Sequence, residues 1–202
     1  MAVVLHTFAS WQGWVYLIVS AAAGTVILAY LVRSDPKLLQ RRLRGLGTEK
    51  ETSQKLLQVA IGVVVIGTIV VSSRDHRASW SSVPPFVEII GDLLLLTAYG
   101  VMHAAFRSNT FASVNIVVES GQRVISTGPY GVLRHPYYAG LLLWVVATPL
   151  ALGSWWALLM IVPMMLILRW RIRYEERFLE EHLAGYVEYC RRVQYRLIPL
   201  VW

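Results

Sequence analysis

Five long apolar stretches constrain the fold of this chain more than any other feature. They are separated by polar segments and occupy residues 11–32, 56–72, 86–106, 136–152 and 155–172. Several approach or exceed the roughly 18 apolar residues that suggest a bilayer span, and only 15% of all residues are charged. Lipid favours helices for such stretches, because a helix closes its backbone hydrogen bonds within itself. The sequence therefore predicts an all-α, polytopic membrane helical bundle with about five transmembrane helices.

The residues after the last apolar stretch predict one further helix. Between residues 174 and 192 charged side chains are interspersed with Phe178, Leu179, Leu183 and Tyr186, which fall on one side of a helix. We expect a C-terminal amphipathic helix there. The length of 202 residues suits one domain. We expect residues 1–202 to form a single integral membrane domain, with residues 1–108 as a scaffold and residues 109–202 carrying the chemistry.

The basic residues predict how the bundle is oriented. Of 19 Lys and Arg residues, seven lie between the first two apolar stretches, two between the second and third, three between the third and fourth, and seven after position 168. Five spans put 17 of them on one side and two on the other. Since Lys and Arg favour the cytoplasmic side, we expect the N-terminus outside and the C-terminus in the cytoplasm. The net charge of +7 then reflects loops beside anionic lipid and does not indicate nucleic acid.

Titratable residues elsewhere in the chain give weaker signals. Glu88 and Asp92 are four residues apart and share a helix face near the start of the third stretch. They are close enough to its end that we expect them to reach water. The single cysteine, Cys190, excludes an internal disulfide. The five histidines show no metal-ligand spacing, so we expect no metal site.

The segment 128–140, GPYGVLRHPYYAG, has a composition that a membrane helix does not need. It combines a Gly-Pro turn, the cation Arg134, the imidazole of His135 and three tyrosines within thirteen residues. Pro136 suits the first position of a helix, because the N–H that proline lacks would have no partner there. His135 would then stand just before the helix, so the segment could present its polar side chains at the membrane surface.

A second polar segment, RIRYEE at 171–176, follows the fifth apolar stretch. A helical hairpin returns to the side on which it began, so this segment and 128–140 can be neighbours on the cytoplasmic side. A carboxylate can hold an amine, and an arginine can hold a carboxylate or phosphate with two hydrogen bonds. Each residue also has a structural explanation, because Arg171 and Glu175 could pair along a helix and His135 could cap one. Together they favour a site for an organic ligand.

These segments resemble the isoprenylcysteine carboxyl methyltransferase and phospholipid methyltransferase superfamily. The resemblance rests on GPYGVLRHPYYAG, the downstream pair Glu175 and Glu176, the tyrosines Tyr186 and Tyr189, and the closing RLIP, and it covers residues 109–199. It implies an integral membrane enzyme that uses S-adenosylmethionine. The implied partners are membrane lipid and a lipophilic or prenylated acceptor, with the carboxylate of a prenylcysteine-like or other lipid-like molecule as the group that is methylated.

The resemblance also assigns roles to individual residues. It implies that Glu175 binds the amino-acid part of the cofactor and that Arg171 binds the substrate carboxylate, with His135 completing the catalytic group. The implied cofactor contacts are Gln122, Arg123, Val124, Ile125, Tyr130, His135, Pro136, Tyr138, Glu175 and Glu176.

Three other functions stay open at this point. The acceptor could be the amine of a phospholipid, which would have to lose a proton before methylation. Some membrane reductases share a similar C-terminal layout, so an oxidoreductase that binds a nicotinamide is possible. A non-enzymatic transport or assembly protein is the third alternative, and ionisable residues deep in several spans would favour it.

Overall fold

The computed structural model describes residues 11–45, 51–119 and 121–202, and the regular structure within them is helical. Three helices are long and apolar enough to cross a membrane: α2 (Trp11–Arg33), α4 (Thr52–Ala78) and α5 (Pro85–Ser108). The shorter apolar helix α6 (Pro136–Ala151) follows, and then α7 (Ile161–His182). The predicted all-α membrane bundle is confirmed. Three of the five expected spans are both long enough and apolar enough to cross a membrane.

The last two expected spans differ from simple membrane helices. Helix α6 begins at Pro136, as the sequence predicts, and ends at Ala151, just before Gly153 takes a positive φ of 70°. A 3-10 turn, η3 (Trp156–Met160), then leads into α7. Helix α7 is apolar in its first half and charged from Arg169 onward, so it carries the chain from the bundle to the polar end of the molecule.

The C-terminal amphipathic segment is divided between two helices. Helix α7 continues without a break from its apolar half to His182, and α8 (Tyr186–Arg192) begins after Gly185, which has a φ of 82°. Glycine adopts this left-handed conformation without steric cost. The structure also contains a short helix in the first basic connector, α3 (Pro36–Gly45), which carries Arg41, Arg42 and Arg44.

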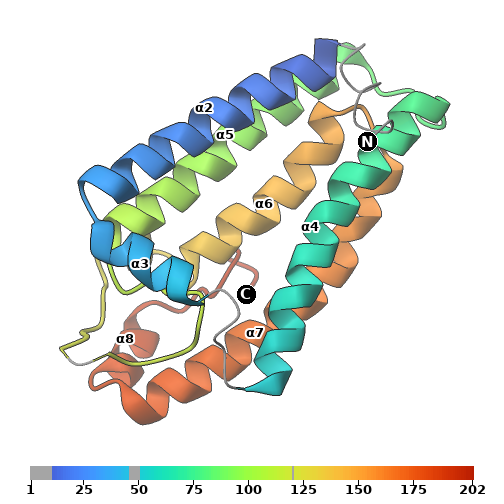
Figure 1. Ribbon diagram of the computed structural model, residues 1–202. Helices are drawn as coiled ribbons and strands as arrows, with labels where there is room; N and C mark the ends of the chain where they lie inside the picture. The colour runs from blue at the N-terminus through green and yellow to red at the C-terminus, as the bar shows by residue number, and fades with distance from the viewer. Residues whose placement is uncertain (1–10, 46–50, 120) are drawn as a thin grey trace.

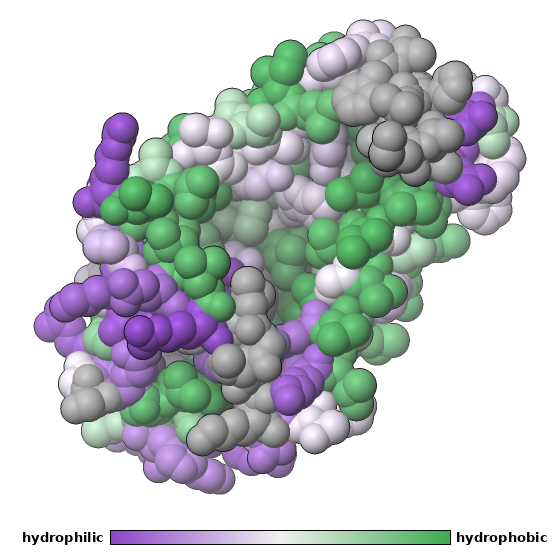
Figure 2. All heavy atoms as spheres, in the orientation of Figure 1, coloured by the Kyte–Doolittle hydropathy of each residue, from purple (hydrophilic) through white to green (hydrophobic). Residues whose placement is uncertain are grey.

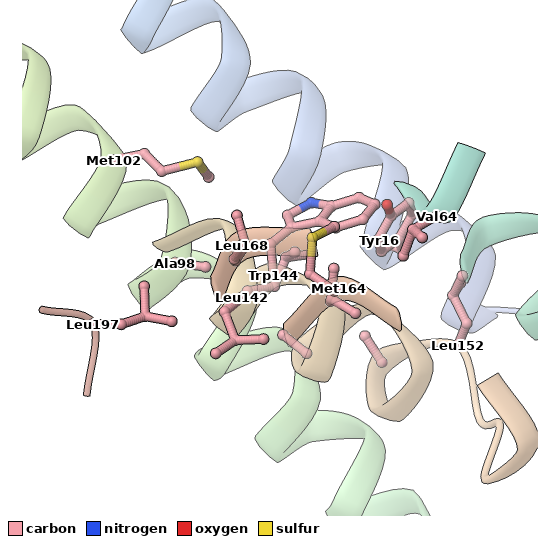
Figure 3. Close-up of a cluster of buried hydrophobic side chains, with 14 of the residues drawn as sticks. Tyr16, Val64, Ala98, Met102, Leu142, Trp144, Leu152, Met164, Leu168 and Leu197 are labelled. Atoms are coloured by element: carbon pink, nitrogen blue, oxygen red, sulfur yellow. The ribbon is translucent and has the colours of Figure 1, made fainter. Parts of the chain in front are cut away.

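Helices α5 and α6 form the most extensive helix pair, with α2 against α5, and α4 and α7 lie beside each other (Figure 1). The core lies where α5, α6 and α7 meet, and Ala98, Met102, Leu142, Trp144 and Leu168 point into it (Figure 3). At Gly91 of α5, a Cβ would collide with the backbone of Leu150 and Ala151, and at Gly140 of α6 it would lie 2.6 Å from Met102 Cγ. The small residues therefore let the helices approach closely, as membrane helices often do.

The expectation that Glu88 and Asp92 reach water is wrong for this structure. Both carboxylates are buried within the protein. The Nε2 of Gln12, at the start of α2, donates to both carboxylate oxygens of Glu88 at 3.2 and 3.3 Å. The turn at Gly153 covers the same carboxylate from the other side. Glu88 is therefore a contact between α5, α2 and the α6–η3 turn, which sequence spacing alone does not reveal.

The close approach at Gly91 generates a test of the packing. Gly91→Ala should lose about 1–3 kcal/mol of stability, because the added methyl has no space to occupy. Gly100→Ala is the matched control on the same helix, since a Cβ there meets nothing within 4 Å. The control should be neutral or slightly stabilising. Thermal unfolding in detergent, followed by tryptophan fluorescence, measures both variants, and equal melting temperatures would contradict this packing.

Candidate active site

The two polar segments predicted to meet are in contact. The hydroxyl of Tyr138, on the first turn of α6, donates to Glu175 Oε2 of α7 at 2.9 Å. Arg134 Nη1, just before α6, pairs with Glu176 Oε1 at 3.1 Å. The connection between α6 and α7 reverses the chain, so residues about forty positions apart lie side by side. The predicted hairpin is thus confirmed in its main consequence.

Local backbone geometry fixes the segment that precedes α6. A 3-10 turn, η2 (Gly128–Gly131), begins at Gly128, where φ is 58° and a Cβ would lie 2.5 Å from Ser108 Oγ of α5. Only glycine fits both the conformation and the space. The turn leads to His135, which stands at the N-cap position of α6. The Gly-Pro-Tyr-Gly turn therefore packs against the end of α5 and leads directly to His135 and Tyr138 at the start of α6.

The C-terminal tail completes this segment through its backbone. The N–H groups of Arg134 and His135 donate to the carbonyls of Tyr195 and Arg196, each at 2.9 Å. The guanidinium of Arg134 donates to the carbonyls of Val193 and Cys190 at 2.6 and 2.8 Å, at the C-terminal end of α8. A cation is favourable there because the helix end exposes unpaired carbonyls. Arg134 therefore joins α6, α7, α8 and the tail.

Glu176 is the centre of a buried ion cluster. Its side chain is 5% exposed and contacts Arg134, Arg196 Nε at 2.6 Å and His135 Nε2 at 3.5 Å. Burial by itself raises the pKa of a carboxyl, but the contacts with His135, Arg196 and Arg134 outweigh it and lower the pKa of Glu176 to about 2. The carboxylate is held ionised by cations of the protein itself.

Glu175, the adjacent residue, has a different environment. Its side chain is 25% exposed, accepts the Tyr138 hydroxyl and lies 4.0 Å from His135 Nδ1. The imidazole of His135 stacks on the Tyr138 ring with centroids 5.7 Å apart. Adjacent positions on a helix point in different directions, so Glu175 faces a cavity while Glu176 faces the ion cluster.

That cavity lies between the connector 109–125, the start of α6, α7 and α8, and encloses about 850 Å³, part of it open to solvent. Eight of the ten residues expected to contact a cofactor line it. They are Gln122, Arg123, Val124, Ile125, Tyr130, His135, Tyr138 and Glu175.

Three residues expected in the site do not line the cavity. Pro136 is buried at the start of α6, and the carboxylate of Glu176 is turned toward the ion cluster. Arg171 is 2% exposed and donates to Gln54 Oε1 at 2.8 Å, to the carbonyl of Val114 and to the Tyr138 hydroxyl at 3.3 Å. Arg171 therefore supports Tyr138 from outside the cavity, and its part in binding a substrate carboxylate stays a prediction.

Other residues that line the cavity were not predicted as site residues from the sequence. Tyr186 and Tyr189 of α8 and Asn109 at the end of α5 line the cavity, and so does Arg42 of α3. Burial raises the pKa of Tyr130 to about 12, so its phenol keeps its proton at neutral pH. The Tyr186–Tyr189 pair was visible in the sequence, whereas Arg42 was counted only as one of many basic residues.

A second hollow opens beside the cavity. It is an apolar groove between α2, α5 and the start of α6, lined by Gly24, Ile27, Leu28, Leu31, Arg42, Tyr99, Met102, Phe106 and Tyr137. The surface is hollowed between α2 and α4, with hydrophobic side chains around the depression (Figure 2). Groove and cavity share two lining residues, Arg42 and Tyr137. Among the described residues, no group of three or more His, Cys, Asp or Glu could hold a metal.

The ion cluster generates a test by pH. Because the pKa of Glu176 in the folded protein, about 2, lies below its ordinary value of 4.5, its contribution to stability is complete above pH 4.5 and is lost as pH falls toward 2. Glu176→Gln should lose about 3 kcal/mol at pH 7, and the difference from wild type should shrink below pH 4.5. The exposed Glu188→Gln serves as the control in denaturant titrations. A difference that stays constant between pH 7 and 3 would refute the cluster.

Comparison with known proteins agrees with this geometry. Residues 87–185 match the family model described as phospholipid methyltransferase. The chain is 35% identical over 107 residues to protein-S-isoprenylcysteine O-methyltransferase B of Arabidopsis thaliana, a match that covers 52% of each protein. It is 31% identical over 94 residues to a delta(14)-sterol reductase of Mus musculus, covering 43% of this chain and 22% of the reductase. The chain spans about half the length of the first of these relatives and less of the second. By these matches and the motifs at its cavity, residues 87–185 of the chain are similar to the isoprenylcysteine carboxyl methyltransferase and phospholipid methyltransferase superfamily.

Proposed function

We propose that this membrane protein transfers a methyl group from S-adenosylmethionine to a lipophilic acceptor, and that the acceptor group is the carboxylate of a prenylcysteine-like or other lipid-like molecule. The observation that carries the proposal is the position of the cavity. Its polar wall contains the motif residues His135, Tyr138 and Glu175, and it adjoins an apolar groove between α2, α5 and the start of α6. From the charge distribution we place the cavity on the cytoplasmic side, with the N-terminus outside.

The residues present fit the proposed cofactor. Glu175 offers a partly exposed carboxylate for an ammonium group, and Arg123 a guanidinium for a carboxylate. The rings of Tyr130, Tyr138 and Tyr186 can face a cationic sulfonium. Apolar side chains of Val124, Ile125, Leu179 and Leu183 suit a flat heterocycle. The cavity thus combines the charged, aromatic and apolar surfaces that such a molecule needs.

The chain's own residues would act mainly by positioning. When bound, the cofactor would supply a methyl group on a sulfonium; its transfer to a carboxylate oxygen would form an O–C bond and break the C–S bond, leaving an ester and a neutral thioether. A carboxylate is already ionised at pH 7, so it requires no base. Tyr138, held by Arg171 and Glu175, would fix the reacting groups in line. The apolar walls would exclude water and strengthen the attraction between the two charges.

Two alternatives each have an observation in their favour. The family model is named for phospholipid methylation, so an amine acceptor is the first. An amine must lose a proton, for which His135 or Glu175 lies in the cavity wall, and its methylation rate should rise with pH, whereas that of a carboxylate should not. The similarity to a sterol reductase is the second. A reductase would bind a nicotinamide cofactor, and competition of NADPH with S-adenosylmethionine would reveal it.

Glu175 provides the sharpest test of the proposed cofactor. Glu175→Gln should weaken S-adenosylmethionine binding by about 10- to 100-fold, because it removes a charge-assisted hydrogen bond. Calorimetry on the detergent-purified protein gives the affinity. Glu180→Gln, five residues further along α7 and exposed, should bind like wild type. Equal affinity of the Glu175 variant and wild type, or no binding by wild type, would count against the proposal.

A further inference from the structure

We propose that Arg42 binds the anionic head of the lipophilic acceptor, at the point where the apolar groove meets the cavity. The inference rests on the proposed function and names the residue that selects the acceptor. The chemistry that Arg42 would recognise is an oxyanion, either a carboxylate or a lipid phosphate, carried on a hydrocarbon chain that lies in the groove. The family resemblance assigns this role to Arg171.

The position of Arg42 is the first argument. It lines both the groove and the cavity, and Tyr137 is the other residue that does so. The rest of the groove wall comes from apolar or aromatic residues of α2, α5 and α6. A molecule with its chain in this groove and its reactive end in the cavity would therefore pass Arg42. Since an oxyanion is costly to bring into apolar surroundings without a partner, a cation at this junction is where its head would stop.

The guanidinium is held in place, which is the second argument. It lies over the Phe106 and Tyr137 rings, with its central carbon 4.6 and 4.8 Å from the two centroids. It donates to the carbonyl of Ala112 at 3.3 Å and to the Tyr137 hydroxyl at 3.1 Å. An arginine has five N–H donors, and these contacts engage two of them. The group is thus oriented before a ligand arrives and retains donors with which to bind it.

The helix that carries Arg42 is itself anchored. Leu38 of α3 is fully buried and packs with Leu31 of α2 and Phe106 of α5. The Asp35 carboxylate caps the start of α3 by accepting from the Leu38 N–H at 3.0 Å. An arginine on a fixed helix loses less conformational entropy on binding than one on a loop. The anchoring therefore favours a recognition role for Arg42.

The charges around the junction are the third argument. The neighbouring Arg41 is paired with Glu119 at 2.7 Å. Within the described ranges 11–45, 51–119 and 121–202, no carboxylate lies within 4.0 Å of the Arg42 guanidinium. The positive charge at the junction is thus not neutralised by a described carboxylate. Arg171, in contrast, is buried among Gln54, Val114 and Tyr138 and does not line either hollow.

Two probe pairs test the inference. The first is S-farnesylated N-acetylcysteine as the free acid and as its neutral methyl ester, and the second is dioleoyl phosphatidylethanolamine and dioleoylglycerol. Binding of each probe to detergent-purified protein is measured for wild type, Arg42→Gln, Arg42→Lys and Arg44→Gln. Arg44 is the matched control, since it is an exposed cation of the same helix that lines neither hollow.

The expected result is a loss confined to the probes that carry an oxyanion. Arg42→Gln should weaken the binding of at least one of these two probes tenfold or more and leave its partner without the oxyanion within twofold of wild type. Arg42→Lys should recover part of the loss, and Arg44→Gln should match wild type. A loss for the farnesylated acid alone identifies a carboxylate head, and a loss for the phospholipid alone identifies a phosphate.

Other outcomes would overturn the inference. Equal weakening of charged and neutral probes by Arg42→Gln would mean that Arg42 only shapes the groove. Equal effects of the Arg42 and Arg44 variants would mean that the surface charge matters rather than this site. Because these measurements need no turnover, they distinguish the inference from the proposed function. If wild type transfers no methyl group but Arg42 selects the probes that carry an oxyanion, the proposed function fails while the inference stands.

Discussion

The buried carboxylate of Glu176 is the interaction on which the arrangement of the site depends. It is bound by Arg134 before α6 and Arg196 of the tail, and His135 lies 3.5 Å away. A buried ion pair of this kind is costly to break, because the remaining partner is left charged and unpaired. The cluster therefore keeps three segments that are distant in sequence in one orientation. Its position directs Glu175 toward the cavity, because adjacent residues on a helix cannot face the same way.

The fold could be predicted from the sequence where composition decides the outcome. The apolar stretches gave α2, α5 and the start of α6 to within a few residues, because lipid leaves a long apolar segment little choice but a helix. The breaks of the C-terminal half were harder to locate. The apolar face that begins at Phe178 continues to Tyr186, so periodicity alone does not show that Gly185 divides the helix. Its spacing predicts that Glu88 reaches water, since spacing cannot reveal that Gln12 of another helix covers the carboxylate.

The candidate site was predictable to the extent that motifs carry it. GPYGVLRHPYYAG and Glu175 led to one cavity because a hairpin brings its ends together. The sequence does not predict that Glu175 faces the cavity while Glu176 faces the ion cluster. This difference depends on Arg134 and Arg196, whose positions next to Glu176 the sequence does not show. Arg171 and Arg42 show the same limit. Both are arginines with other arginines near them in the sequence, and only the structure distinguishes the one behind Tyr138 from the one that lines the cavity.

We propose that the cavity between the connector, α6, α7 and α8 binds S-adenosylmethionine. Ultraviolet cross-linking of the methyl-labelled cofactor to the detergent-purified protein, followed by peptide mapping, tests it most directly. We predict label within residues 122–138 and 175–189, and its loss when S-adenosylhomocysteine is added in excess. Label confined to α2 or α4, or label that excess S-adenosylhomocysteine does not displace, would contradict the account.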